Sequence, residues 1–66
     1  MANFPDYDET VAKYKEKGTV FVNVSDFNGN FQAAEAWLNA IAMTAKKKGE
    51  TKQTKKRVTL TALDHQ

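Results

Sequence analysis

Hydrophobic and polar residues change their spacing several times along the chain, and each spacing predicts a different element. Residues 6–17 begin with the acidic sequence DYDE, which has the form of a helix-capping box, and Gly18 stands where a helix would end. Lysines concentrate at the other end of this segment, as the helix dipole favours. A strand over residues 10–15 is the competing interpretation. We predict a helix over residues 6–17, with an inward face of Tyr7, Val11 and Tyr14.

Residues 19–24 have the clearest strand pattern, because nearly all of them are β-branched or aromatic. Val20, Val22 and Val24 fall on one face of this predicted strand, since side chains alternate along a strand. Phe21 and Asn23 fall on the other face. The aromatic ring of Phe21 implies that this second face is at least partly covered.

A turn over residues 25–30 precedes a second predicted helix. Asn28 and Gly29 adopt positive φ at low cost, and Asn30 can cap the helix that follows. We predict this helix over residues 31–47, where three lysines and then Gly49 mark its end. Its apolar residues recur with helical spacing: Phe31, Ala34, Leu38, Ile41, Ala42 and Ala45.

The last third of the chain contains one further strand. Residues 50–56 have no apolar side chain, and we predict a mobile basic loop over residues 49–56. Residues 57–63 alternate, with Val58 and Leu60 on one face, and predict a half-buried strand. Residues 64–66 are assigned to a tail.

The predicted element order is therefore α-β-α-β, in one small domain over residues 1–66 of the α+β (α/β-like) class. Two helices would pack on a small sheet, and a parallel pairing of its strands would need a right-handed crossover. Two strands make a poor sheet, because edges then outnumber interior strands. We expect dimerisation to complete the sheet by pairing the edges of two copies, so the protein is predicted to be a homodimer.

Composition narrows the class of protein. A chain of 66 residues allows one domain, and without cysteine it has neither a disulfide nor a Cys-based zinc site. The sequence holds no apolar run of membrane-spanning length and no basic, then apolar, signal sequence at its start. We therefore expect a cytoplasmic protein that does not bind membranes.

Charge is distributed unevenly. Residues 1–45 carry three basic and six acidic side chains, whereas residues 46–66 carry seven basic and two acidic ones. The formal net charge of +2 thus conceals −3 followed by +5. This asymmetry is the clearest functional signal in the sequence.

Catalytic chemistry has little support. The single histidine, His65, lies next to the C-terminal residue, where a general base is seldom held in place. The turn that starts at Asp26 has too few carboxylates for a calcium loop, since Trp37 stands where a bidentate glutamate is required. We expect no enzymatic activity, no metal and no cofactor.

The basic segment instead favours binding of nucleic acid through its phosphate backbone, without sequence preference. Contacts with an acidic protein surface, or no role beyond solubility, are the alternatives for these lysines. The predicted nucleic-acid-binding residues are Lys46, Lys47, Lys48, Lys52, Lys55, Lys56 and Arg57.

A second function remains open. The protein could be a small modulator or inhibitor, of the type that phages and mobile elements encode, which occupies the surface of a partner protein. Trp37 and Phe21 are the predicted partner or dimer interface, because aromatic side chains dominate binding hot spots. For Trp37, a place in the core is the competing interpretation.

Overall fold

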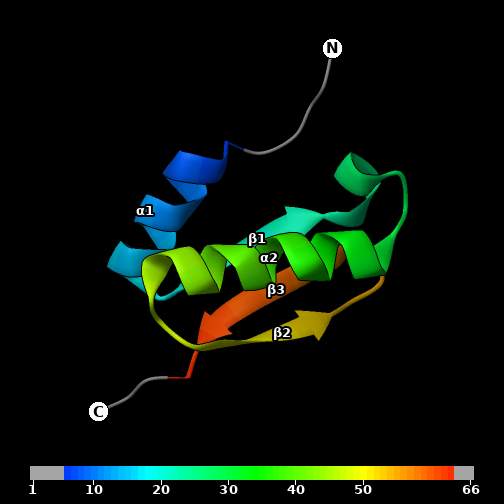
Figure 1. The fold of residues 1–66 in the computed structure, drawn as a ribbon. Helices are drawn as coiled ribbons and strands as arrows, with labels where there is room; N and C mark the ends of the chain where they lie inside the picture. The colour runs from blue at the N-terminus through cyan, green and yellow to red at the C-terminus, as the bar shows by residue number, and fades with distance from the viewer. Residues whose placement is uncertain (1–5, 64–66) are drawn as a thin grey trace.

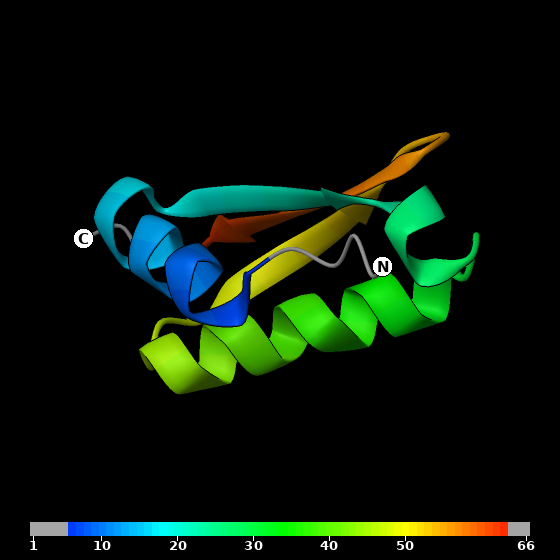
Figure 2. The ribbon, with the colours of Figure 1, turned by 90° about the horizontal axis from the view of Figure 1, so that it is seen from above.

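The fold is a three-stranded antiparallel sheet with two α-helices on one of its faces (Figures 1 and 2). The computed structural model describes residues 6–63. The strand order is β1-β3-β2, so β3 is central and the other two strands are edges. Two helices on a small sheet confirm the predicted α+β class. The elements are α1 (Tyr7–Lys17), β1 (Thr19–Asn23), the 3-10 helix η1 (Val24–Phe27), α2 (Phe31–Ala45), β2 (Gly49–Gln53) and β3 (Arg57–Ala62).

The first helix forms as its capping residues predict. The Asp6 carboxylate accepts a hydrogen bond of 3.0 Å from the Glu9 backbone N–H, which satisfies one of the free donors of the first turn. Gly18 ends the helix in the left-handed conformation, with φ of 79°. The helix over residues 6–17 is thus confirmed, and the competing strand over residues 10–15 is excluded.

The second helix begins as predicted but ends earlier. The Asn30 side chain accepts a hydrogen bond from the Ala33 N–H at 3.1 Å, which caps the N-terminus. The helix stops at Ala45 rather than at residue 47, because Lys46 adopts a left-handed φ of 58°. The N–H groups of Lys46 and Lys47 then turn back to carbonyls of the last turn, which is a Schellman ending without its usual glycine.

The predicted loop over residues 49–56 is wrong for most of its length, since Gly49–Gln53 forms the edge strand β2. This strand pairs antiparallel with β3, with Thr51 opposite Leu60. Its side chains are polar because an edge strand at the rim of the sheet buries little, so the hydrophobic pattern carries no strand signal. Backbone hydrogen bonds to β3, rather than side-chain burial, hold it in place.

The parallel arrangement considered for the two predicted strands is also wrong. β1 pairs antiparallel with β3, with Val20 opposite Leu60 and Val22 opposite Val58. The element order is α-β-α-β-β, and the chain itself supplies the third strand. The expectation that a second copy must complete a two-stranded sheet therefore loses its premise, while a homodimer stays a prediction.

The hydrophobic core lies between the sheet and the helices. From the sheet it takes Val20 and Val22 of β1 and Val58 and Leu60 of β3. Alternation along each strand sends these residues to one face, and burial of each large side chain contributes about 1.5–3 kcal/mol. The helices and η1 supply Val11, Tyr14, Val24, Phe27, Ala34, Leu38, Ile41 and Ala42.

Tyr14 connects the first helix to the start of β2. Its side chain is fully buried, and its hydroxyl lies 2.8 Å from the carbonyl oxygen of Lys47 and 3.0 Å from that of Lys48. Gly49 comes next in the chain, and a Cβ atom there would overlap the Tyr14 hydroxyl. Gly49 is therefore required for the close approach of β2, in addition to marking the region where α2 ends.

Candidate nucleic-acid interface

The face of the sheet that turns away from the helices is polar, cationic and uncovered by any residue of 6–63. We call it the open face. Phe21 on β1, Thr59 on β3 and Lys52 on β2 lie side by side across its centre, as the strand registers require. The full set on this face is Thr19, Phe21, Asn23, Glu50, Lys52, Arg57, Thr59 and Thr61.

Phe21 is the large apolar side chain of this face, and 54% of it is exposed. The sequence-based expectation that its face is at least partly covered is therefore wrong for the described residues. The guanidinium carbon of Arg57 lies 4.4 Å from the centroid of the Phe21 ring, which is a cation–π contact. Because the guanidinium lies over one face of the ring, a flat ligand can stack either on the guanidinium or on the other face of Phe21.

The β2–β3 hairpin adds further cations at one end of the open face. Lys55 and Lys56 form its tip, and both side chains are exposed. The Thr54 backbone N–H donates to the Arg57 carbonyl oxygen at 2.8 Å, and the Val24 N–H donates to the Lys56 carbonyl oxygen at 2.9 Å. Backbone hydrogen bonds thus hold the tip beside the end of β1, while the two ammonium groups are free to contact a ligand.

A hollow of about 500 Å³ lies next to this tip, where η1 leads into α2. Lys55 and Lys56 contribute cations to its wall, and Asn23 and Ser25 contribute polar groups. It opens at the end of the open face that carries Arg57, since Asn23 stands opposite Arg57 in the sheet. A phosphate chain that crosses the open face could continue past this hollow.

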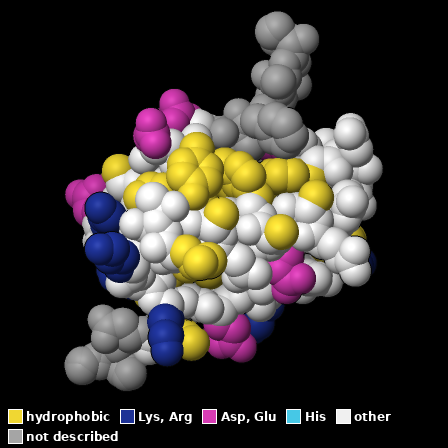
Figure 3. All heavy atoms as spheres, viewed as in Figure 1, with side chains coloured by type: hydrophobic (Ala, Val, Ile, Leu, Met, Phe, Trp, Pro, Cys, Tyr) yellow, Lys and Arg dark blue, Asp and Glu magenta, His cyan; other side chains and the backbone are white. Residues whose placement is uncertain are grey.

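The structure divides the predicted seven-residue site into two groups. Lys46–Lys48 precede β2, whereas Lys55, Lys56 and Arg57 follow it, so the strand separates the groups by its own length, roughly 15–17 Å. Figure 3 shows Lys and Arg side chains gathered at the end of the molecule where α1 and α2 finish, away from the hairpin tip of Figure 1. Lys52 lies between the groups, on the open face.

Lys47 in the first group already has intramolecular contacts. Its ammonium donates to the Lys15 carbonyl oxygen at 3.1 Å and lies 5.8 Å from the centroid of the Tyr14 ring. These contacts tie the α2–β2 connection to the C-terminal end of α1, where a cation is favourable. Lys47 is therefore better explained by local packing than by ligand binding.

Trp37 is half-buried between the two helices and η1. Its ring meets Tyr7 edge-on, with centroids 5.6 Å apart, and meets Phe27 at 5.9 Å. The Tyr7 hydroxyl in turn lies 2.6 Å from the Thr44 hydroxyl and 3.1 Å from the Ala40 carbonyl oxygen. Figure 3 shows hydrophobic side chains exposed on the helix side of the molecule. The ring contacts of Trp37 nevertheless make it part of the packing between the helices. The prediction of Trp37 as a partner interface stays untested.

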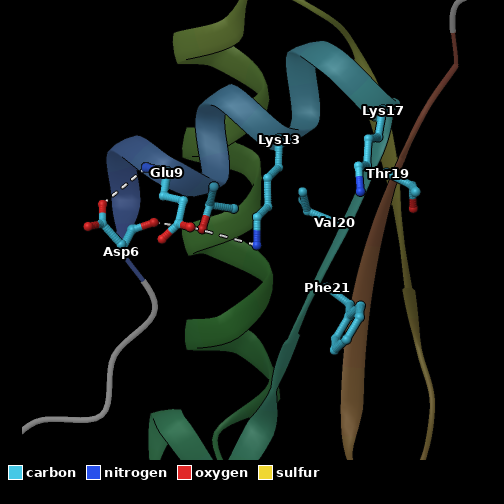
Figure 4. Close-up of a pocket in the computed structure, with 8 residues that line it drawn as sticks. Asp6, Glu9, Lys13, Lys17, Thr19, Val20 and Phe21 are labelled. Atoms are coloured by element: carbon cyan, nitrogen blue, oxygen red, sulfur yellow. Dashed lines mark hydrogen bonds and ion pairs between the residues drawn. The ribbon is translucent and has the colours of Figure 1, made fainter.

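The acidic side chains lie mostly away from the open face. Four of them, Asp6, Asp8, Glu9 and Glu16, belong to α1 or its cap. A hollow of about 520 Å³ separates α1 from β1, and carboxylates and lysines share its wall (Figure 4). There Glu9 and Lys13 form an exposed ion pair at 3.9 Å. On the open face, Glu50 is the sole carboxylate among residues 6–63, so this face has a positive net charge.

Other groups that could carry chemistry lie elsewhere or outside the described residues. Glu35 accepts a hydrogen bond of 2.7 Å from the Thr51 hydroxyl, which ties α2 to β2. Residues 6–63 contain no cluster of three His, Cys, Asp or Glu residues that could hold a metal ion. His65 and the predicted tail over residues 64–66 lie outside the described residues.

Comparison with known proteins adds no family to this geometry. No protein-family model, no curated protein and no solved structure matches the chain. Within residues 6–63, no helix is long and apolar enough to cross a membrane. Function must therefore be argued from the open face itself.

Proposed function

We propose that the protein binds single-stranded nucleic acid on its open face, with little sequence preference. The observation that carries this proposal is the exposed Phe21 ring, which contacts Arg57 on the same face as Lys52, with the lysines of the hairpin tip at the end of that face. Basic residues without an aromatic partner can hold a phosphate backbone but cannot stack bases. The fold brings Phe21 from a distant part of the chain to the basic segment, and so supports both kinds of contact at one surface.

The site has the chemistry that unpaired bases require. A base that stacks on an aromatic side chain contributes about 1–3 kcal/mol, whichever base it is, because every base has a π-face. Lys52, Lys55 and Lys56 would then neutralise phosphates on either side of the stacked base. The bases of a duplex are already stacked on one another, so they do not offer a free face to Phe21. Single strands are therefore the favoured ligand.

Fluorescence anisotropy of a labelled oligothymidine and of a duplex of equal length, each at two salt concentrations, tests the proposal. We expect binding of the single strand to be tighter than binding of the duplex, and to weaken as salt rises. The proposal is wrong if neither ligand binds at low salt. If the duplex binds as tightly as the single strand, stacking on Phe21 is not used.

Two variants separate stacking from charge. Phe21→Leu keeps an apolar side chain but removes the aromatic face, and should weaken single-strand binding roughly tenfold with little change in its salt dependence. Lys55→Glu with Lys56→Glu should weaken binding of both ligands and reduce the slope of log affinity against log salt by about 2. Lys15→Glu is the matched control for the single variant Lys55→Glu, since it makes the same charge change at an exposed position of α1 that does not line the hollow beside Phe21. Equal losses in these two single variants would show that only net charge matters.

The second candidate function is that of a modulator that binds a partner protein. One observation supports it: a hollow of about 550 Å³ between α2 and the start of β2, with Met43 78% and Leu63 52% exposed and Lys46–Lys48 beside them. An apolar hollow with cations at its rim suits an acidic, amphipathic segment of another protein. A partner captured from cell extract by the wild-type protein, but not by a Met43→Asp variant, would favour this function over nucleic-acid binding.

A further inference from the structure

The outer edge of β2 has no partner strand among residues 6–63. At the two ends of the hairpin, Thr54 N–H donates to the Arg57 carbonyl oxygen and Leu63 N–H donates to that of Lys48. Bonded and non-bonded pairs alternate in an antiparallel ladder, so the even-numbered residues of β2 are those that bond to β3. The N–H and C=O groups that point outward therefore belong to Gly49, Thr51 and Gln53.

The charges of β2 select one register for a second copy of this strand. An antiparallel pair of identical strands is related by a two-fold axis. An axis at residue 50, 51 or 52 places the outward N–H and C=O groups of one strand opposite those of the other, so that they can form hydrogen bonds. An axis at Glu50 or at Lys52 places two like charges directly opposite, which destabilises the pair. An axis at Thr51 places Glu50 opposite Lys52 of the partner subunit, and does so twice because of the symmetry. The strand is thus complementary to itself in one register.

We propose that two copies of the chain associate through their β2 edges, with Thr51 opposite Thr51 of the partner subunit. The result is a continuous six-stranded sheet. The axis is perpendicular to the sheet, so both copies of α2 lie on one side and both open faces lie on the other. This inference does not depend on the proposed function, because it uses only the edge and its charges.

The other edge of the sheet suits such pairing less well. β1 has no charged residue to set a register. The first helix also flanks it, and Lys13 and Lys17 line the hollow between this helix and β1 (Figure 4). A strand that approaches β1 would therefore meet these side chains, whereas no strand of residues 6–63 pairs with the outer edge of β2.

The dimer should be weak. A five-residue edge buries little area, and interfaces of less than about 1,200 Å² are usually transient. The axis also brings the hairpin tip of each copy toward the end of the other copy that carries Lys46–Lys48, and these lysines repel one another. The two Thr51 hydroxyls near the axis lie on the helix side of the sheet and add little, because each already donates to Glu35 of its own chain. We expect a dimer that forms only at high protein concentration.

Sedimentation equilibrium of the full chain over a wide concentration range, without nucleic acid, measures this association. Glu50→Lys and Lys52→Glu should each weaken the dimer at least tenfold, because each sets like charges opposite one another. The double variant that carries both changes should dimerise like the wild type. An equimolar mixture of the two single variants should form a heterodimer more readily than either variant associates with itself.

Glu16→Lys is the matched control, since it makes the charge change of Glu50→Lys on an exposed part of α1 and should leave the dimer unaffected. Far-ultraviolet circular dichroism confirms that each variant is folded. A chain that stays monomeric at the highest concentration overturns the proposal. A dimer whose association is not weakened by the single substitutions also overturns it, as does a double variant that fails to restore association. In either case the contact lies elsewhere or in another register.

Discussion

The two faces of the sheet carry opposite chemistry although their residues alternate along the same strands. Val58 and Leu60 are fully buried under the helices, whereas Arg57 and Thr59, their neighbours in the chain, face away from them. On β1 the same alternation buries Val20 and Val22 and leaves Phe21 exposed. Residues of the hydrophobic core and residues of the proposed binding face therefore stand only one position apart in the chain. A substitution on one face should therefore leave the property of the other face nearly unchanged.

The largest effect on stability is expected from the covered face, which is the face of the sheet that packs against the helices. Leu60→Ala removes a fully buried side chain from the centre of the sheet and should lower the free energy of unfolding by about 2–5 kcal/mol. Phe21→Leu, on the open face, should change it by less than about 0.5 kcal/mol. Urea denaturation of both variants, beside the oligonucleotide titration, checks the contrast. A Phe21 variant as unstable as the Leu60 variant would show that the open face is part of the core.

The next largest effect is expected where the covered face meets the chain before β2. Tyr14→Phe leaves the ring in place but removes the donor to the Lys47 and Lys48 carbonyl oxygens. Loss of this buried donor leaves the Lys47 carbonyl oxygen without its partner, whereas that of Lys48 still accepts from the Leu63 N–H, so unfolding should become easier by about 1–3 kcal/mol. Urea denaturation at neutral pH gives this difference. A Tyr14→Phe protein as stable as the wild type would mean that water satisfies the Lys47 carbonyl oxygen.

The Tyr14 hydroxyl should also make the stability of the protein depend on pH in the alkaline range. Burial raises the pKa of Tyr14 above the ordinary tyrosine value of about 10, because desolvation disfavours the phenolate. Below about pH 10 the group is protonated in both states, and its contribution to stability is fully present. As pH rises through the unfolded pKa toward the folded one, the unfolded state releases its proton first, and stability falls. The wild type should therefore lose more stability than Tyr14→Phe between neutral and strongly alkaline pH, as paired melting curves would show.

A smaller effect, of opposite sign, is expected at the end of α2. Lys46 holds a left-handed φ of 58°, a conformation that costs an ordinary residue about 1–2 kcal/mol and that glycine adopts freely. Lys46→Gly should stabilise the protein by about 0.5–1 kcal/mol, since part of the gain is offset by the greater entropy of glycine in the unfolded chain. Thermal denaturation measures this gain. The variant should bind oligonucleotide as the wild type does if the open face and hairpin tip form the site.

The sequence predicts the helices well because their ends have local chemical markers. Asp6, Gly18 and Asn30 cap or end helices through contacts within a few residues, and these contacts are present in the structure. The sequence also identifies β1 and β3 by alternation. It does not reveal β2, because Gly49–Gln53 forms a strand through backbone pairing with β3 and its side chains carry no hydrophobic pattern.

The candidate site was only partly predictable for the same reason. The basic residues and Phe21 could each be singled out, but as members of different surfaces. An extended β2 moves Lys46–Lys48 to one end of the sheet and the hairpin-tip lysines to the other. Antiparallel pairing of β1 with β3 then sets Phe21 beside Arg57, although 36 positions separate them in the chain. A contact between residues so distant in sequence leaves no mark in a local pattern.

The sequence alone determined the helix ends, the apolar alternation of two strands and the uneven charge, because each depends on residues only a few positions apart. The tertiary structure decided which strands pair, which face stays open and which cations share a surface with the aromatic ring. Those outcomes depend on backbone hydrogen bonds between distant segments, and such bonds form regardless of side-chain polarity. The polar strand β2 is the clearest example, because it forms through backbone pairing with β3 and no pattern of side chains in the sequence indicates it.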